Sequence, residues 1–318
     1  MLPESHAGAG GVRDLELAAR VLRLRSRRLV TGRFAGAYAS AFRGGGLEFE
    51  ELRPYAPGDD PRDFDWNATA RTGMPHVRRF REERDHRLTL ALDCASSLRC
   101  PITRGQQAGQ PRVRFAAEVG ALLAAAAARV GDRCGLVTLS QQRPLEIPAR
   151  RGIGHAWHLQ RSALRAAAET PAAARFDGDL QALVERASGR GALCLLSDLR
   201  APQIDAEPQR VFDLLRRLAQ RHDLVCITVW DPSDAWLPRA GLVETSIPGA
   251  GQRVRLLDTS RKAVRWAHET AFQRFRASRE RLLAKAGCDS LWLRCDRDPL
   301  QALVHFFEAR ALRPRSHP

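Results

Sequence analysis

The sequence contains no apolar run long enough to cross a bilayer. Its longest run, residues 119–128, is rich in alanine and is well short of the roughly 18 residues that a membrane-spanning helix needs. The first residues, Met1 to His6, also lack a basic stretch followed by an apolar one, which a secretory leader requires. We therefore expect a cytoplasmic protein without a membrane span.

Paired cysteines are missing as well. The seven Cys residues are odd in number, no two of them form a C-x-x-C pair, and several lie inside apolar runs. A disulfide framework in a secreted domain usually shows an even number of cysteines at regular spacing. The pattern instead indicates reduced thiols that pack as small apolar side chains.

Lysine is almost absent, since only Lys262 and Lys285 occur among 51 basic side chains. With 36 acidic side chains the formal net charge is +15. Clustered cations would favour nucleic-acid binding, because they release counterions when they meet phosphate. Here the arginines are spread along the whole chain, which indicates a dispersed, solvated surface. This pattern argues against nucleic-acid or polyanion binding, which we keep as an alternative function.

The 318 residues, 44% of them hydrophobic, are enough for one large domain with an extension. An amphipathic pattern predicts a short helix over 15–30. Residues 32–83 are rich in glycine, proline and charge, so we expect them to be extended or looped. From Arg87 onward, residue patterns typical of strands alternate with patterns typical of helices.

This alternation predicts an α/β fold, a mostly parallel sheet with helices on both faces. Strands are expected over 88–93, 134–139, 144–148, 192–198, 224–231 and 290–293, with a hairpin over 241–247 and 253–257. Prolines at both ends of 144–148 restrict that strand to an edge of the sheet. Helices are expected over 113–130, 154–168, 180–187, 211–220, 260–286 and 299–309.

Three of the expected strands end in an aspartate, namely Asp93, Asp198 and Asp231. Ligands of open α/β sheets bind beyond the carboxyl ends of the strands, which makes these residues candidates for a site. Asp231 is followed directly by Pro232, so it is more simply a turn residue. Asp93 instead opens the sequence D-C-A-S-S.

The D-C-A-S-S element resembles the metal-ion-dependent adhesion site of von Willebrand factor A domains, D-x-S-x-S. The resemblance implies metal-ligand roles for Asp93, Ser97 and Asp198, and Ala95 stands where a serine ligand belongs. Hydroxyl and carboxylate oxygens suit Mg²⁺, so a degenerate site could bind this ion weakly, or with help from a partner's acidic residue. Alternatively, Asp93 and Ser97 only cap the following turn and helix.

The same resemblance calls for a threonine from a second loop. The best candidate loop, residues 176–180, offers Gly178 or Asp179 at that place. Asp179 could replace the hydroxyl with a carboxylate. The site is therefore expected to be incomplete.

The segment ahead of the first strand carries a longer and more specific motif. It reads E-F-x-x-x-R-x-Y-x-P-G-D-D-x-R-x-x-D-W-x-x-x-A-R and resembles the hallmark of the bacterial domain-of-unknown-function family fifty-eight, which contains a von Willebrand factor A-like domain. The resemblance runs from about residue 32 to near residue 310. Its signature positions are Glu48, Arg53, Tyr55, Gly58, Asp59, Asp60, Arg62, Asp65, Trp66 and Arg71.

Acidic and basic side chains alternate along this signature, which favours a network of ion pairs. Tyr55 and Trp66 are expected to anchor the segment on the core. It could instead form a partner-binding surface. A third possibility is a Mg²⁺-dependent hydrolase, and that site would use Asp59, Asp60, Asp63 and Asp65. No Ser-His-Asp or Cys-His arrangement accompanies these aspartates, so we expect no enzymatic activity.

These patterns divide the chain into an N-terminal helix and start (1–31), a signature segment packed on the core (32–86), a von Willebrand factor A-like domain (87–310) and a tail (311–318). What the family resemblance implies is a non-enzymatic interaction or scaffold role beside a MoxR-type AAA+ ATPase. Such proteins are thought to assist assembly, maturation or cofactor insertion in a client complex. A second von Willebrand A protein is a further expected partner.

Overall fold

The computed structural model describes residues 32–43, 47–56, 64–82, 86–105, 108–141, 143–169, 176–186, 189–246 and 254–313. The helix expected over 15–30 and most of the tail lie outside the described residues. In the described part of the chain, no helix is both long and apolar enough to cross a membrane.

A six-stranded sheet forms the centre of the molecule, in the order β10-β7-β6-β3-β4-β5. All neighbours are parallel except β5, which pairs with β4 in the antiparallel sense and closes one edge. The strands are β3 (Arg87–Asp93), β4 (Arg133–Leu139), β5 (Glu146–Arg150), β6 (Ala192–Ser197), β7 (Asp223–Trp230) and β10 (Asp289–Arg294). The mostly parallel sheet and the edge position of the proline-containing strand are confirmed, but β5 begins two residues later than predicted and contains Pro148.

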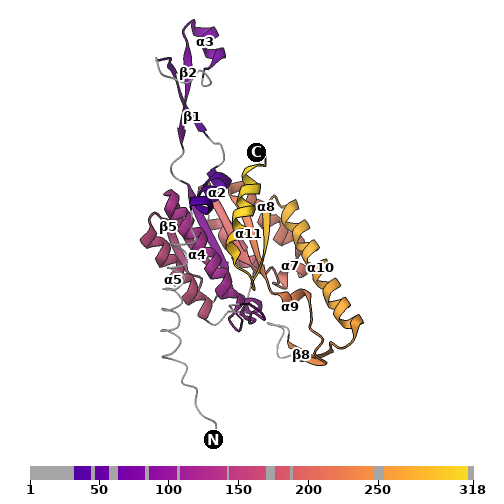
Figure 1. Ribbon diagram of the computed structural model, residues 1–318. Helices are drawn as coiled ribbons and strands as arrows, with labels where there is room; N and C mark the ends of the chain where they lie inside the picture. The colour runs from indigo at the N-terminus through magenta and orange to yellow at the C-terminus, as the bar shows by residue number, and fades with distance from the viewer. Residues whose placement is uncertain are drawn as a thin grey trace.

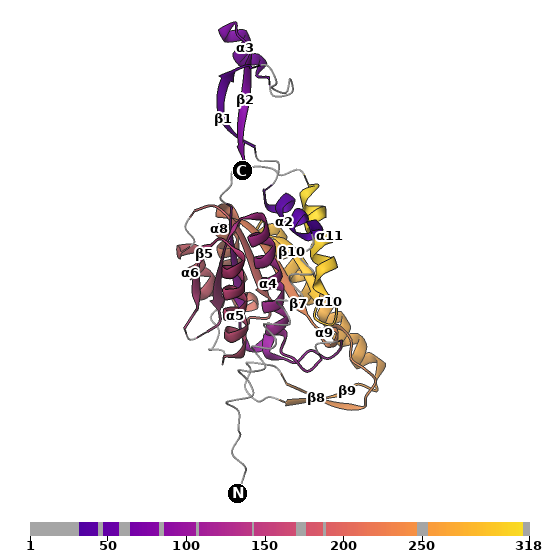
Figure 2. The ribbon, with the colours of Figure 1, turned by 60° about the vertical axis from the view of Figure 1, so that its left-hand side comes forward.

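Helices cover both faces of the sheet, as Figures 1 and 2 show. One face packs against α2 (Gly32–Arg43), α4 (Arg112–Val130), α5 (Ile153–Ala168) and α11 (Pro299–Ala311). The other packs against α6 (Phe176–Arg186), α7 (Gln203–Ala206), α8 (Pro208–Arg221) and α10 (Lys262–Lys285). In β3, Leu90 and Leu92 enter the first core and Ala91 enters the second. A parallel strand covered on both faces is apolar almost throughout, which is why this segment was readable from sequence. We call the sheet and these helices the sheet domain.

Helix α2 was not expected, because residues 32–43 were predicted to be extended or looped. Phe34, Tyr38 and Phe42 recur every four residues and form a single buried stripe. The stripe packs on Phe307 of α11, with ring centroids 6.2, 6.2 and 5.3 Å away, respectively. Tertiary packing of this stripe outweighs the helix-weakening effect of Gly36. The predicted boundary at residue 32 was therefore wrong, since α2 belongs to the sheet domain.

Residues 47–82 form a separate unit, which we call the arm. Strand β1 (Leu47–Pro54) pairs with β2 (His76–Glu82) in the antiparallel sense, and α3 (Trp66–Thr72) lies between them in the chain. Helix α3 begins where the Ala68 N–H donates to the Asp65 carboxylate at 2.9 Å, and it ends at Gly73, whose φ of 72° suits glycine. In Figures 1 and 2 the arm stands away from the sheet domain.

The expectation that residues 32–86 pack on the core therefore holds for α2 and is wrong for the described residues of the arm. Trp66 is 70% exposed and Tyr55 is 40% exposed. Both rings stack on Phe64, at centroid distances of 5.3 and 5.2 Å. Tyr55, Phe64 and Trp66 thus pack on one another within the arm, and they do not anchor the arm to the sheet domain.

A hairpin, a 3₁₀ turn and a short helix complete the described chain at the end of the sheet away from the arm. Strands β8 (Leu242–Ser246) and β9 (Val254–Asp258) form the expected hairpin. A 3₁₀ turn, η2 (Ser96–Arg99), follows β3, and the short helix α9 (Pro232–Ala235) follows β7. The loops carrying η2 and α9 therefore lie beyond the carboxyl ends of their strands.

Candidate functional site at the carboxyl edge of the sheet

The strand order reverses at β3, whose two neighbours are β4 and β6. The chain leaves β3 towards β4 on one side and later returns to β6 on the other. Ligands of open α/β sheets bind at such a switch point, outside the carboxyl ends of the strands. The acid site considered below consists of five residues at this edge, Asp93, Ser140, Asp179, Ser197 and Asp198.

Asp93 is at the centre of the acid site and is 1% exposed. Its Oδ1 accepts hydrogen bonds from the Ser140 hydroxyl and the Ala95 N–H, both at 2.9 Å. Its Oδ2 accepts from the Ser197 hydroxyl at 2.6 Å. Burial raises the pKa of Asp93, and the two serine hydroxyls oppose that rise. Three donors therefore hold this carboxyl group in one orientation.

Asp198 lies beside Asp93 and is much less well satisfied. Its Oδ1 accepts from the Arg200 N–H at 3.1 Å, while its buried Oδ2 has no hydrogen-bond partner among the described residues. Burial, followed by the charge of Asp93, raises the pKa of Asp198 to about 6, and the nearby Ser97 hydroxyl opposes this. Asp198 is thus a buried acid that changes its charge close to neutral pH.

Asp179 reaches the same site from the first turn of α6. Its Oδ2 accepts from the Ser140 N–H at 2.8 Å, so Ser140 bridges Asp179 and Asp93 through its backbone and its side chain. Ser140 has a φ of 60°, a conformation that is uncommon for a residue other than glycine. Burial, and then the charge of Asp177, raises the pKa of Asp179.

The structure thus places three of the four predicted residues, Asp93, Asp179 and Asp198, in the acid site. The fourth, Ser97, is half-buried in η2 beside Asp198. The sequence analysis missed Ser140 and Ser197, which supply the hydroxyls bound to Asp93. A signal for both was present, because Ser140 directly follows β4 and Ser197 ends β6. The rule that drew attention to strand-end aspartates applies equally to these serines.

The comparisons with known proteins extend over both the arm and the sheet domain. The family model "Protein of unknown function DUF58" matches residues 51–278. The chain is 32% identical over 308 residues to "Uncharacterized protein Rv1480" of Mycobacterium tuberculosis and to "Uncharacterized protein Mb1516" of Mycobacterium bovis, covering 95% of this chain and 92% of each relative. The chain belongs to the DUF58 family. The family is of unknown function, and these relatives are uncharacterized.

Solved structures similar to this DUF58 chain include conserved hypothetical protein BatB from Bacteroides thetaiotaomicron, with a TM-score of 0.42 at 13% identity. That match covers 71% of this chain and 98% of BatB. The SpRpn10 VWA domain has a TM-score of 0.37 at 10% identity, covering 69% of this chain and 93% of that domain. The parallel sheet with helices on both faces agrees with the von Willebrand factor A-like architecture expected for the DUF58 chain.

A divalent cation does not fit the acid site of this DUF58 chain as it is arranged. Both oxygens of Asp93 already accept hydrogen bonds, and Ala95 offers no side-chain ligand. Within the described ranges, no group of three or more His, Cys, Asp or Glu side chains could hold a metal ion. Mg²⁺ binding remains a prediction from the resemblance, and this geometry gives it no support.

Asp231, the third strand-end aspartate, has the structural role expected for it. Its carboxylate accepts from the Ser233 N–H at 2.9 Å and from the Thr103 hydroxyl at 2.5 Å, and it caps α9. The side chain of Asp234 reciprocates by accepting from the Asp231 N–H at 2.9 Å. Asp231 therefore fixes two loops at the carboxyl edge.

The signature motif of the DUF58 chain is only partly described. Gly58, Asp59, Asp60 and Arg62 lie outside the described residues, as do Asp63 and the side chain of Glu48. Asp65 caps α3, Arg71 is exposed in the last turn of that helix, and Arg53 donates to the Pro54 carbonyl at 3.2 Å. The hydrolase alternative depended mainly on undescribed aspartates and stays a prediction.

The arm and the acid site lie at opposite edges of the sheet. The arm ends at Glu82 and the chain enters β3 at Arg87, the amino end of that strand. Asp93 is at the carboxyl end, and seven residues of a parallel strand span roughly 20 Å at about 3.3 Å each. The described part of the arm therefore lies too far from the acid site to contact it.

Proposed function

We propose that this DUF58 protein is a non-enzymatic interaction module that works with a MoxR-type AAA+ ATPase and a client complex. The work would be assembly, maturation or cofactor insertion, and a second von Willebrand A protein is a further partner. The observation that carries the proposal is the exposed aromatic stack of the arm, Tyr55, Phe64 and Trp66. The partner class comes from the family resemblance.

The stack has the properties of a binding anchor. Trp and Tyr are enriched among the few residues that carry most of the binding energy at protein interfaces. The inter-ring angles of 23° and 18° show that the three rings are stacked nearly parallel. Rings held this way lose little conformational freedom on binding. Met74, which is 65% exposed, adds an adaptable apolar side chain to the arm.

Two further observations support a non-enzymatic role. All seven cysteines are buried or half-buried, and burial raises the pKa of every one of their thiols. These groups are therefore protonated near neutral pH and are poor nucleophiles. The best-formed acidic cluster, at the carboxyl edge, has the oxygens of Asp93 occupied by internal donors.

The acid site is the competing docking surface, because the family resemblance places a partner's acidic group there. The geometry favours the arm, since Asp93 and Asp198 are 1% and 2% exposed while Trp66 is 70% exposed. A partner could not reach the two aspartates without displacing the loops above them. The two surfaces can be separated by mutation.

The test is a calorimetric titration of a MoxR-type ATPase from the same organism with wild type, Trp66→Ala, Asp198→Asn and Trp266→Ala. Trp266 lies on α10, is 66% exposed and serves as the matched control. We expect Trp66→Ala to weaken binding at least about tenfold, the size typical of an interface anchor, and the other two to bind like wild type. Wild-type affinity of Trp66→Ala, or equal loss in Trp266→Ala, would refute the arm as the docking surface.

A further inference from the structure

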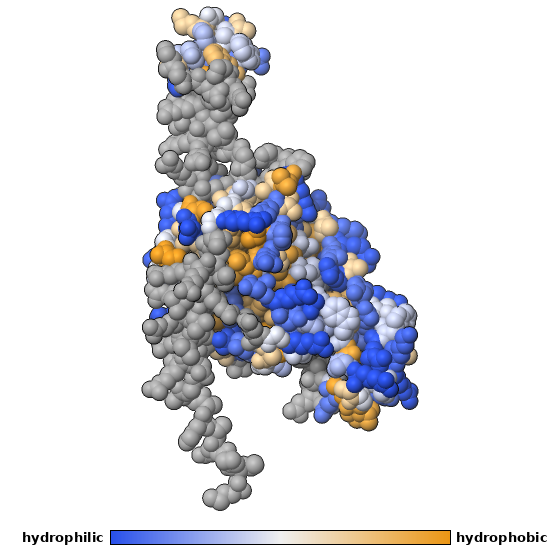
Figure 3. Space-filling view, viewed as in Figure 1, coloured by the Kyte–Doolittle hydropathy of each residue, from blue (hydrophilic) through white to orange (hydrophobic). Residues whose placement is uncertain are grey.

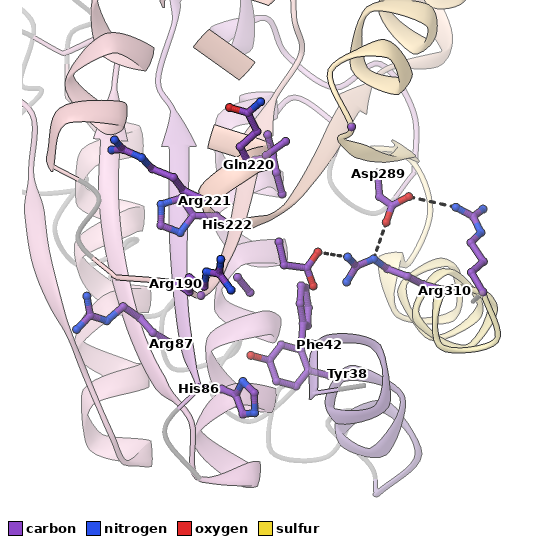
Figure 4. Close-up of a pocket in the computed structure, with 17 residues that line it drawn as sticks. Tyr38, Phe42, His86, Arg87, Arg190, Gln220, Arg221, His222, Asp289 and Arg310 are labelled. Atoms are coloured by element: carbon purple, nitrogen blue, oxygen red, sulfur yellow. Dashed lines mark hydrogen bonds and ion pairs between the residues drawn. The ribbon is translucent and has the colours of Figure 1, made fainter. Parts of the chain in front are cut away.

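A second concave site lies at the amino edge of the sheet, at the root of the arm. It encloses about 520 Å³, within the range of small-ligand pockets. Its walls come from the starts of β3, β6, β7 and β10 and from helices α2, α8 and α11. His86 and Arg87, which line it, are the first described residues after the arm. Figure 4 shows the side chains that face this cavity.

The cavity is lined by five arginines and only two aspartates. Both aspartates, Asp223 and Asp289, are bound by Arg310, which donates to Asp289 at 2.7 Å and also contacts Asp223. Arg313 adds a further bond to Asp289 at 3.1 Å. On one side of the cavity, Arg310 and Arg313 therefore neutralise the two aspartates.

On the other side of the cavity, Arg190 and Arg221 have no acidic partner among the residues that the structure describes. Arg190 makes no hydrogen bond or ion pair with any residue that the structure describes. Arg221 donates to the Val184 carbonyl at 3.0 Å, a neutral acceptor. In Figure 4 these two side chains lie with Arg87 and His222 on one side, across from Asp289 and Arg310.

His222 lies close to the arginines on this side of the cavity, and their positive charge affects its imidazole. Its Nε2 is buried and has no hydrogen-bond partner in the described ranges. Burial, followed by the charges of Arg221 and Arg87, lowers the pKa of His222. An anion placed among these side chains would offset the repulsion and accept from the imidazole.

We propose that this cavity binds a small phosphate-bearing molecule through Arg190, Arg221 and His222. A phosphate group brings nearly two negative charges and three acceptor oxygens, which matches several cations around one space better than a single carboxylate does. Guanidinium groups bind phosphate through paired, charge-assisted hydrogen bonds. The apolar side chains of Tyr38, Phe42 and Leu224 line the cavity too, and leave room for a less polar part of the ligand.

Calorimetry with the full chain tests this site, using inorganic phosphate, pyrophosphate and ADP as probes and adenosine as the uncharged comparison. The variants are the double substitution Arg190→Gln with Arg221→Gln, and Arg216→Gln as a control. Arg216 is exposed on α8, the helix that also carries Arg221, but it does not line the cavity. The melting temperature of each variant shows that it is folded.

We expect at least one phosphate probe to bind with a saturating isotherm, adenosine not to bind, and the double variant to lose at least about tenfold in affinity. Equal binding of phosphate and ADP would locate recognition in the phosphate group, and tighter binding of ADP would add the apolar wall. No binding of any phosphate probe would overturn the proposal. So would the same loss in Arg216→Gln, since dispersed positive charge would then explain the binding.

Discussion

At the scale of single residues, the buried aspartates of the acid site differ in how many hydrogen bonds their oxygens accept. Asp93 is held by three donors, whereas Asp198 has an oxygen without a partner among the described residues. Buried polar groups that lose a hydrogen bond cost more than the bond itself contributes, because their desolvation is no longer offset. Removing a donor to Asp93 should therefore lower stability, whereas removing the charge of Asp198 should raise it.

Removing the hydroxyl of Ser197 should destabilise the fold. Ser197→Ala deletes the 2.6 Å bond to Asp93 and the acceptor of the Leu199 N–H, and it leaves a buried carboxylate oxygen without a donor. We expect the free energy of unfolding to fall by about 1–3 kcal/mol in urea titrations. Ser40→Ala, at an exposed position of α2, should change it by less than about 0.5 kcal/mol. A loss in Ser197→Ala no larger than this would mean that Asp93 does not depend on the hydroxyl.

Asp198 should make stability depend on pH. Its pKa is raised to about 6 in the folded chain, against about 3.9 when unfolded. The folded state therefore holds its proton more tightly, and wild-type stability falls as the pH rises from about 4 through 6. Asp198→Asn cannot ionise, so its stability relative to wild type should increase over that window by as much as about 2–3 kcal/mol.

Urea titrations from pH 4.5 to 8 measure this difference, with Asp213→Asn as the control on the exposed face of α8. The control should follow the wild-type profile. A stability difference between Asp198→Asn and wild type that stays constant across the series would show that Asp198 keeps an ordinary pKa.

At the scale of elements, the sequence predicted most of the sheet domain and failed at α2 and the arm. Strands such as β3 are apolar on both faces and end at an aspartate, so local pattern alone located them. Helix α2 shows a stripe of three aromatic residues, but Gly32 and Gly36 beside it suggested a loop. Only the partner surface on α11 makes this segment helical, and a contact with residue 307 cannot be seen locally.

The packing of α2 on α11 gives a direct stability prediction. Phe34 is fully buried against Phe307, so Phe34→Ala should lower the free energy of unfolding by about 3–5 kcal/mol. The neighbouring Arg33 is exposed and pairs with Glu308 at 2.9 Å, and Arg33→Ala should lower stability far less, because solvent screens an exposed ion pair. Chemical denaturation of the two variants compares them, and similar losses would contradict a docked α2.

The arm marks the limit of sequence reasoning about this chain. The motif identified the family, but its charged and aromatic residues do not say whether the segment packs inward or projects. Tyr55 and Trp66 could pack on the core or on Phe64 within the arm, and the structure has the second arrangement.

At the scale of the whole molecule, the two edges of the sheet have different characters. The carboxyl edge holds a closed acidic cluster, and the amino edge holds an arginine-rich cavity at the root of a projecting arm. Figure 3 shows hydrophilic side chains over much of the visible face of the sheet domain, with apolar groups near the hairpin β8–β9. Exposed Leu242 and Leu256 belong to that hairpin. The arm is the element least tied to the sheet domain, which suits it to contact another protein.

Replacing residues 47–82 with a short Gly-Ser linker tests this account most directly, because it removes the arm and keeps α2 and β3. We predict that the shortened chain melts within a few degrees of wild type and loses measurable affinity for a MoxR-type ATPase of the same organism in calorimetry. A folded, arm-less chain that binds the ATPase as tightly as wild type would contradict the account.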